Sequence, residues 1–70
     1  MTDLRALGLN ERQIEALRLM VNEGKVLSNA DYRRLFSVSK NTASRDLQAL
    51  VKTGWVRIEE TGRGTRYRAV

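Results

Sequence analysis

Apolar residues recur with helical spacing along most of the chain and with alternate spacing at its end. Over residues 11–23, 29–36 and 40–53, hydrophobic side chains return every three or four positions, as they do on one face of an α-helix. Over residues 55–60 and 65–70 they alternate with charged ones, which is typical of half-buried strands. The pattern therefore predicts three helices followed by two strands.

Local signals mark the ends of these predicted helices. Asn10 and Gln13 are spaced as reciprocal helix caps, and the same spacing recurs at Ser28 and Asp31. Ser39 can cap the third helix. A glycine, which suits the left-handed position that ends a helix, follows the first and the third helix. The boundaries are thus predicted from short-range chemistry alone.

The apolar faces of the helices define the predicted core. Leu19 and Val21 widen the apolar arc of the first helix, either because they pack under the first residues of the chain or because they form a dimer contact. The inward-facing side chains are expected to be Ile14, Leu17, and Met20 or Val21 on the first helix, Tyr32, Leu35 and Phe36 on the second, and Ala43, Leu47, Leu50 and Val51 on the third.

The connection between the second and third helices is only about three residues long, with Val38 in its middle. Two short helices joined by such a turn are typical of a helix-turn-helix, in which the central apolar residue fills the angle between them. The outer face of the third helix carries Asn41, Arg45, Gln48 and Lys52. That face is either simply solvated or suited to an anionic partner that accepts and donates hydrogen bonds.

The two predicted strands flank a four-residue loop with two glycines, residues 61–64, and should form a hairpin. In the register that this loop predicts, Arg57 lies opposite Arg68. Two opposed arginines normally destabilise a sheet unless an anion or a carboxylate lies beside them, so this pair hints at a binding surface. Trp55 and Tyr67 are assigned to the core or to the base of the hairpin, and residues 25–27 to a short extended segment. The register predicted from the loop pairs Ile58 with Tyr67, Val56 with Ala69, Glu59 with Arg66, and Arg57 with Arg68.

Composition excludes several classes of function. The 70 residues include no cysteine and no histidine, which excludes disulfides, thiolate or imidazole metal ligation, and catalysis by either residue. There is also no phosphate-binding loop and no pair of catalytic carboxylates on one element, so no enzyme and no cofactor is expected. No apolar run approaches the roughly 20 residues of a membrane span, and no signal peptide is evident, so we expect a cytoplasmic protein.

The net charge of +5 is concentrated in one part of the chain. Residues 1–27 hold four basic and four acidic residues, whereas residues 28–70 hold nine basic and four acidic ones. The excess therefore lies on the part that contains the third helix and the hairpin. A localised basic excess is the electrostatic footprint of a protein that binds a polyanion.

Four stretches of the chain carry motifs that occur together in one family: Leu9 to Gln13, Asp31 to Ser39, Thr42 to Leu47 and Gly62 to Tyr67. Together they resemble the winged helix-turn-helix domains of prokaryotic transcription regulators, most closely those that form carboxy-terminal modules of larger bacterial and archaeal regulators. The resemblance covers residues 9–70 and leaves residues 1–8 as a lead segment. It implies an α+β winged helix-turn-helix fold, with three helices, a carboxy-terminal β-hairpin wing and a short strand after the first helix.

The resemblance also implies a site. The third helix would enter the major groove of DNA, and the wing would follow the backbone or the minor groove. Ser39 and Thr42, at the start of the third helix, suit either a phosphate or the capping of the helix itself. Asp46 is expected to pair with an arginine of the same chain rather than to face a phosphate. The predicted DNA-binding residues are Ser39, Lys40, Asn41, Thr42, Ser44, Arg45 and Gln48 on the helix and Arg63, Thr65 and Arg66 on the wing.

The sequence therefore predicts a module that binds double-stranded DNA within a transcription regulator, without catalysis. Two alternatives remain open at this point. One is a winged helix used for protein interaction or for homodimer formation, and the other is an accessory DNA-binding domain attached to a larger enzyme. Membranes and metal ions are not among the expected partners.

Overall fold

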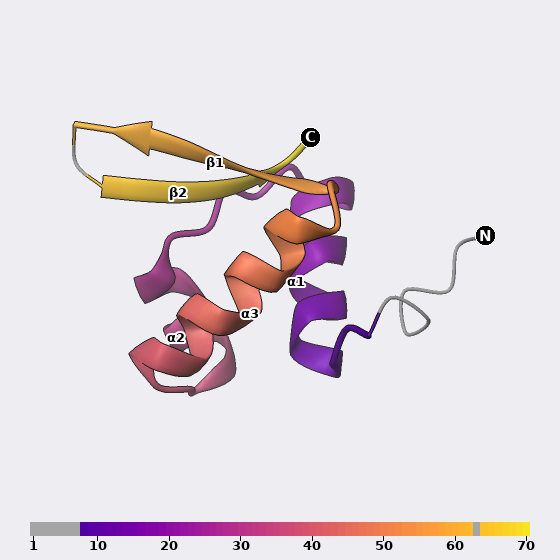
Figure 1. Cartoon of the computed structure of the whole chain (residues 1–70), viewed down its shortest axis with the longest axis vertical. Coiled ribbons are helices and arrows are strands. Elements are labelled where there is room, and N and C mark those ends of the chain that lie inside the picture. Colours follow the sequence, from indigo (N-terminus) through magenta and orange to yellow (C-terminus); the bar gives the residue numbers. More distant parts are fainter. Residues whose placement is uncertain (1–7, 63) are drawn as a thin grey trace.

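The computed structural model describes residues 8–62 and 64–70. Apart from the short strand expected after the first helix, its order of elements is the predicted one: α1 (Glu11–Asn22), α2 (Asn29–Phe36), α3 (Lys40–Lys52), β1 (Val56–Thr61) and β2 (Gly64–Ala69). The hairpin lies across one end of the helices, and α3 runs from beside α2 to the start of β1 (Figure 1). Within the described ranges no helix is long and apolar enough to cross a membrane.

The helices begin at the residues that the sequence marked. Asn10 Oδ1 accepts the N–H of Gln13 at 2.9 Å, and Gln13 Oε1 accepts the N–H of Asn10 at 2.7 Å. Ser28 and Asp31 form the same reciprocal pair at 3.1 and 3.0 Å. Each pair satisfies two N–H groups that a helix end leaves without an intrahelical partner, so both predicted capping boxes are confirmed.

The turn between α2 and α3 depends on Ser37. This residue has a φ of 54°, in the left-handed region that residues other than glycine rarely adopt. It ends α2 and lets the chain enter α3 after only three residues. Val38, in the middle of the turn, is partly buried against the core, as predicted. The helix-turn-helix geometry is therefore built into these few residues.

The core joins all three helices to the hairpin. Met20, and not Val21, supplies the inward side chain near the end of α1; Val21 is 52% exposed. The suggestion that Leu19 and Val21 pack under the start of the chain falls largely on residues 1–7, which lie outside the described residues. The buried apolar residues are Leu9, Ala16, Leu17, Met20, Leu27, Tyr32, Ala43, Leu47, Leu50, Val56 and Tyr67.

One predicted core position, Leu35, is wrong, and of the two places predicted for Trp55 the structure shows the base of the hairpin. Leu35 is 51% exposed, because α2 has only eight residues and its inward side is occupied by Tyr32 and Phe36, whose rings pack in a tilted arrangement with centroids 4.7 Å apart. Trp55 lies at the base of the hairpin, where its carbonyl accepts the N–H of Val70 at 2.9 Å, but its side chain is 44% exposed and does not join the core.

The hairpin register is the predicted one, including the pair Arg57 and Arg68. Arg68 Nη1 lies 3.1 Å from Glu59 Oε2, so a carboxylate of the same hairpin relieves the repulsion and no external anion is needed. The predicted short strand at residues 25–27 is reduced to a single bridge, in which Leu27 and Tyr67 exchange backbone hydrogen bonds of 2.8 and 2.9 Å. This bridge attaches the wing to the segment that precedes α2.

Candidate nucleic-acid interface

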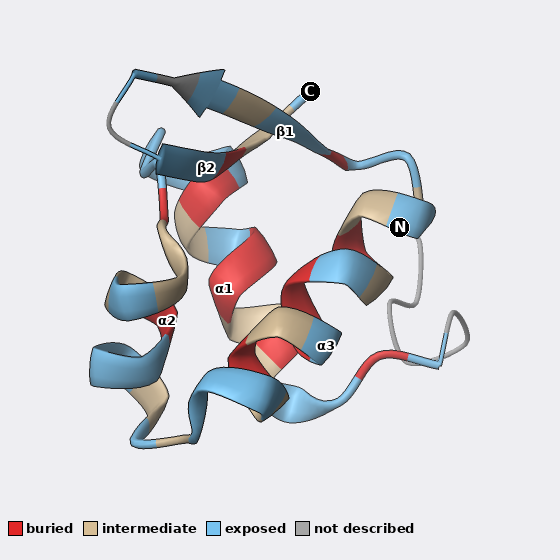
Figure 2. Cartoon of the chain, turned by 60° about the vertical axis from the view of Figure 1, so that its left-hand side comes forward, coloured by how far each residue is buried: buried red, intermediate tan, exposed pale blue. Residues whose placement is uncertain are grey.

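The outer face of α3 is exposed along its whole length. Its buried residues face the core that it shares with α1 and α2, whereas its first turn lies at the surface (Figure 2). Across the described residues, the side chains of Asn41, Arg45 and Gln48 form no hydrogen bond or ion pair with the rest of the chain. The predicted residues Lys40, Asn41, Arg45 and Gln48 are exposed, and Thr42 and Ser44 are intermediate. The structure thus gathers the helical part of the predicted site on one open surface.

Ser39 is used by the helix itself. Its Oγ accepts the N–H of Thr42 at 3.2 Å and donates to Thr42 Oγ1 at 3.1 Å. Of the two roles left open by the sequence, capping is therefore confirmed for Ser39. The Thr42 hydroxyl accepts from Ser39, so its own proton remains available. The N–H groups of the first two residues of α3 also lack intrahelical acceptors, as at any helix start, and favour an anion there.

Asn29 orients Ser44, a contact that sequence reasoning missed. Asn29 Nδ2 donates to Ser44 Oγ at 3.0 Å and to the carbonyl of Lys40 at 3.3 Å. Because the Ser44 oxygen accepts this bond, its hydroxyl proton can be donated to a partner. Asn29 is the first residue of α2, directly after the Ser28 cap, and nothing in its sequence position reveals that it reaches α3.

The inner side of α3 is anchored by the carboxylate of Asp46, which is buried. It accepts hydrogen bonds from Arg12 Nε at 2.9 Å, Tyr32 Oη at 2.7 Å and Asn10 Nδ2 at 3.2 Å. Gln13 Nε2 donates to the Asp46 carbonyl at 3.1 Å. The expectation that Asp46 pairs with an arginine of its own chain is confirmed, and the partner comes from α1.

Electrostatics agree with this geometry. Burial alone would raise the pKa of the Asp46 carboxyl, but the hydrogen bonds from Arg12, Tyr32 and Asn10 outweigh it and hold that pKa below its ordinary value. Burial and the hydrogen bond to Asp46 raise the pKa of the Tyr32 hydroxyl. Tyr32 is therefore held protonated, as the hydrogen-bond donor, and Asp46 is held ionised, as the acceptor.

The wing carries the rest of the predicted site. Thr65 and Arg66 on β2 are exposed, whereas the predicted contact Arg63 lies outside the described residues. The pKa of Asp31 on α2 is lowered, chiefly by the hydrogen bond from the N–H of Ser28 and further by the charges of Arg34 and Arg66. The backbone bridge between Leu27 and Tyr67 attaches β2 to the segment that precedes α2. The wing and the helix-turn-helix thus form a continuous unit.

Solved structures show where this fold occurs. The ST1889 protein of the thermoacidophilic archaeon Sulfolobus tokodaii matches 91% of this chain with a TM-score of 0.77 and 22% identity. The adhesin competence repressor AdcR of Streptococcus pyogenes matches 93% with a TM-score of 0.77 and 19% identity. A structure of HOP2, from work on its DNA recognition and protein interaction domains, matches 84% with a TM-score of 0.67 and 17% identity.

These identities are low, so the likenesses establish the fold alone. This chain spans 64% of the ST1889 chain, 48% of the AdcR chain and 98% of the HOP2 chain. A search among curated protein sequences finds no match. The family model described as the sugar-specific transcriptional regulator TrmB, in contrast, matches residues 4–70. The chain has the winged helix-turn-helix fold and belongs to this TrmB family of transcription regulators.

Proposed function

We propose that this chain binds double-stranded DNA as the DNA-reading module of a transcription regulator. Residues 40–53 would enter the major groove, and the wing, residues 61–66, would lie on the backbone or in the minor groove. The observation that carries the proposal is the outer face of α3, on which Asn41, Arg45 and Gln48 are exposed and form no side-chain hydrogen bond or ion pair among the described residues, although Asp46 anchors the opposite face. Membership of a family of transcription regulators supports it.

The side chains of this face have the chemistry that base edges require. Arginine suits guanine and asparagine or glutamine suits adenine, in each case through two hydrogen bonds in the major groove. Arg45, Asn41 and Gln48 supply these groups. The Ser44 hydroxyl, held by Asn29, can donate a hydrogen bond to a base edge or to a phosphate oxygen. Lys40, in the first turn, is placed for a phosphate.

The start of α3 and the wing would position the helix without reading sequence. The free N–H groups of the first turn and the Thr42 hydroxyl can bind one phosphate, with Ser39 acting through Thr42 as a positioning residue. On the wing, Thr65 and Arg66, together with Arg63, would hold a second stretch of backbone. Contacts on both sides of the inserted helix would fix its register on the duplex.

A fluorescence titration against random duplex DNA at several salt concentrations tests the proposal. Each phosphate that a side chain neutralises contributes about 0.9 to the slope of log affinity against log salt. We expect a slope of several units for the natural sequence. Lys40→Gln should lower that slope by about 0.9, because it removes one phosphate contact.

Lys25→Gln is the matched control, because Lys25 carries the same charge, is exposed, and lies in the segment between α1 and α2, outside the predicted interface. It should leave the slope nearly unchanged. Equal losses for the two variants would mean that net charge, and not the α3 surface, attracts the DNA. A slope near zero for the natural sequence would refute DNA binding altogether.

A further inference from the structure

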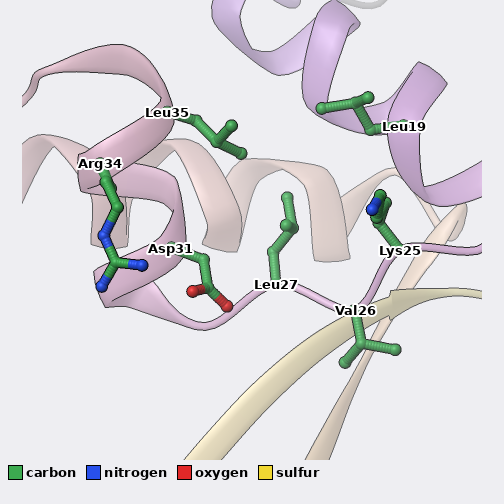
Figure 3. Close-up of a pocket in the computed structure, with 7 residues that line it drawn as sticks. All are labelled: Leu19, Lys25, Val26, Leu27, Asp31, Arg34 and Leu35. Carbon is green, nitrogen blue, oxygen red and sulfur yellow. The ribbon is translucent and has the colours of Figure 1, made fainter.

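An apolar groove opens on another side of the molecule. It has a volume of about 360 Å³ and lies between α1, residues 25–27 and α2. Figure 3 shows Leu19 of α1 on one side, Leu35 of α2 on the other and Leu27 between them, with α3 behind the groove. The groove therefore opens away from α3, and a ligand could occupy it while α3 binds DNA.

The groove walls expose side chains that a folded domain normally buries. Leu35 is 51% and Val26 is 36% exposed, and Leu19 is partly buried. Leu27, which is buried, forms the floor. A concave strip of aliphatic side chains between two helices is the surface that the apolar face of a third helix fits. Covering it would remove these side chains from water, which is favourable.

The rim of the groove is basic. Among the described residues the ammonium group of Lys25 has no ion-pair partner, and Arg34 lies near Asp31. The Asp31 carboxylate already accepts the N–H of Ser28 at 3.0 Å. The rim of the apolar strip thus carries two positive charges, from Lys25 and Arg34, and one negative charge, on a carboxylate that already accepts a hydrogen bond. An occupant that carries carboxylates beside its apolar side chains would complement this rim.

A second copy of the chain does not fit this requirement. In a two-fold dimer the same surface would meet itself, which would bring Lys25 and Arg34 toward the equivalent cations. Most of the described carboxylates are engaged within the chain: Glu15 and Glu23 pair with Arg18, Asp46 with Arg12, and Glu59 with Arg68, whereas Glu11 and Glu60 do not line the groove. A different polypeptide segment, with free carboxylates beside its apolar side chains, therefore complements this rim better than a second copy does.

We propose that this groove binds an amphipathic helix of a partner protein, with leucine-sized side chains at helical spacing flanked by glutamate or aspartate. Leu19, Val26 and Leu35 receive the apolar side chains, and Lys25 and Arg34 hold the carboxylates. The groove thus gives the regulator a protein-binding surface separate from its DNA-binding surface. The proposal does not depend on DNA binding by α3.

The probe is a synthetic amphipathic peptide of about 18 residues, long enough to be helical in water, with leucines on one face and glutamates beside them. Two controls are a peptide of the same composition in scrambled order and one with lysines in place of the glutamates. Backbone amide shifts of the 70-residue chain, measured by NMR, locate the contact. We expect the shifts to cluster around residues 19–35 for the ordered acidic peptide and to be absent for the controls.

Variants with matched controls distinguish the groove from the basic DNA face. Lys25→Glu should weaken binding of the acidic peptide about tenfold, whereas Lys52→Glu, an exposed charge reversal on α3, should change it less than about twofold. Leu35→Ala should also weaken binding about tenfold. Val21→Ala, which shortens an exposed aliphatic side chain outside the groove lining, should have little effect.

Three results would overturn the proposal. Shifts centred on α3, with equal losses for Lys25→Glu and Lys52→Glu, would mean that the peptide binds the DNA face by charge alone. Absence of binding at millimolar peptide would remove the site. Sedimentation that shows a dimer abolished by Leu35→Ala would assign the groove to a second copy. Leu35→Ala should leave DNA affinity unchanged, so a failure of the DNA proposal is recognised separately.

Discussion

Replacing Asp46 by alanine tests whether the buried polar cluster holds α3 in its orientation. The substitution removes the acceptor of three hydrogen bonds, from Arg12 on α1, from Tyr32 on α2 and from Asn10, which caps α1. Tyr32 has no exposed surface, so its hydroxyl cannot turn to water when the carboxylate is lost. The side chain of Arg12, by contrast, is 39% exposed and can be rehydrated.

The magnitude follows from these environments. A buried donor left without an acceptor costs about 1–3 kcal/mol. The bond from Asn10 contributes about 1 kcal/mol or less, because this residue is exposed and water can replace the lost acceptor. We therefore expect Asp46→Ala to lower the free energy of unfolding by about 3 kcal/mol. A domain of 70 residues has roughly 4–10 kcal/mol in all.

Urea unfolding followed by far-UV circular dichroism measures the loss, and a double-mutant cycle assigns it. Tyr32→Phe removes the donor that would be stranded, so Asp46→Ala should cost about 1–2 kcal/mol less in that background than in the natural one. Asp46→Asn keeps an acceptor for Tyr32 and should cost less than alanine. Strict additivity of the two substitutions, or an unchanged unfolding midpoint for Asp46→Ala, would refute the structural argument.

Three further predictions follow from the same helix. The pKa of Asp46 is lower in the folded than in the unfolded state, so its ionised carboxylate stabilises the fold fully above about pH 4, and this stabilisation is lost as the pH falls through the folded-state pKa. The urea midpoint of unfolding should therefore drop more steeply in acid for the natural sequence than for Asp46→Asn. Leu47→Ala, at a position with no exposed surface, should cost about 2–5 kcal/mol in urea unfolding, and an unchanged midpoint would mean that α3 is rotated from its described orientation. Arg45→Ala should change the free energy of unfolding by less than about 0.5 kcal/mol and, if Arg45 contacts a base edge, should weaken binding to a preferred DNA site by about 1–3 kcal/mol. If Arg45 contacts a phosphate instead, titrations over a set of duplexes should show the same loss of affinity for every sequence. Lost stability with intact DNA affinity would contradict the placement of Arg45 on the outer face.

Features governed by neighbouring residues could be predicted from the sequence. The capping pair of Asn10 and Gln13 spans three positions, and the same holds for Ser28 and Asp31. The hairpin register follows from a short loop, because each strand residue is fixed by its distance from the turn. Such features need no knowledge of how the helices pack, so both the order of elements and the fold were predictable.

Features governed by packing could not be predicted in this way. Helical periodicity places Leu35 on the apolar face of α2. This helix has only eight residues, however, and Tyr32 and Phe36 fill the space that it faces in the core. The contact between Asn29 and Ser44 joins residues 15 positions apart, and that between Arg12 and Asp46 joins residues 34 positions apart. The exposure of the α3 surface agrees with the predicted site, whereas its contacts with DNA stay a prediction.

Packing nevertheless explains why that surface is exposed. Arg45 and Asp46 are consecutive, so their side chains leave α3 about 100° apart. Partners on two other elements fix Asp46 at 2.7 and 2.9 Å, and turning the helix far enough to bury Arg45 would break both bonds. The outward direction of Arg45 is thus determined by residues on α1 and α2 that the helix-based prediction of the site never used. Under the proposed function, a substitution at Arg12 or Tyr32 is therefore expected to change DNA binding indirectly, by changing the angle at which α3 presents its outer face.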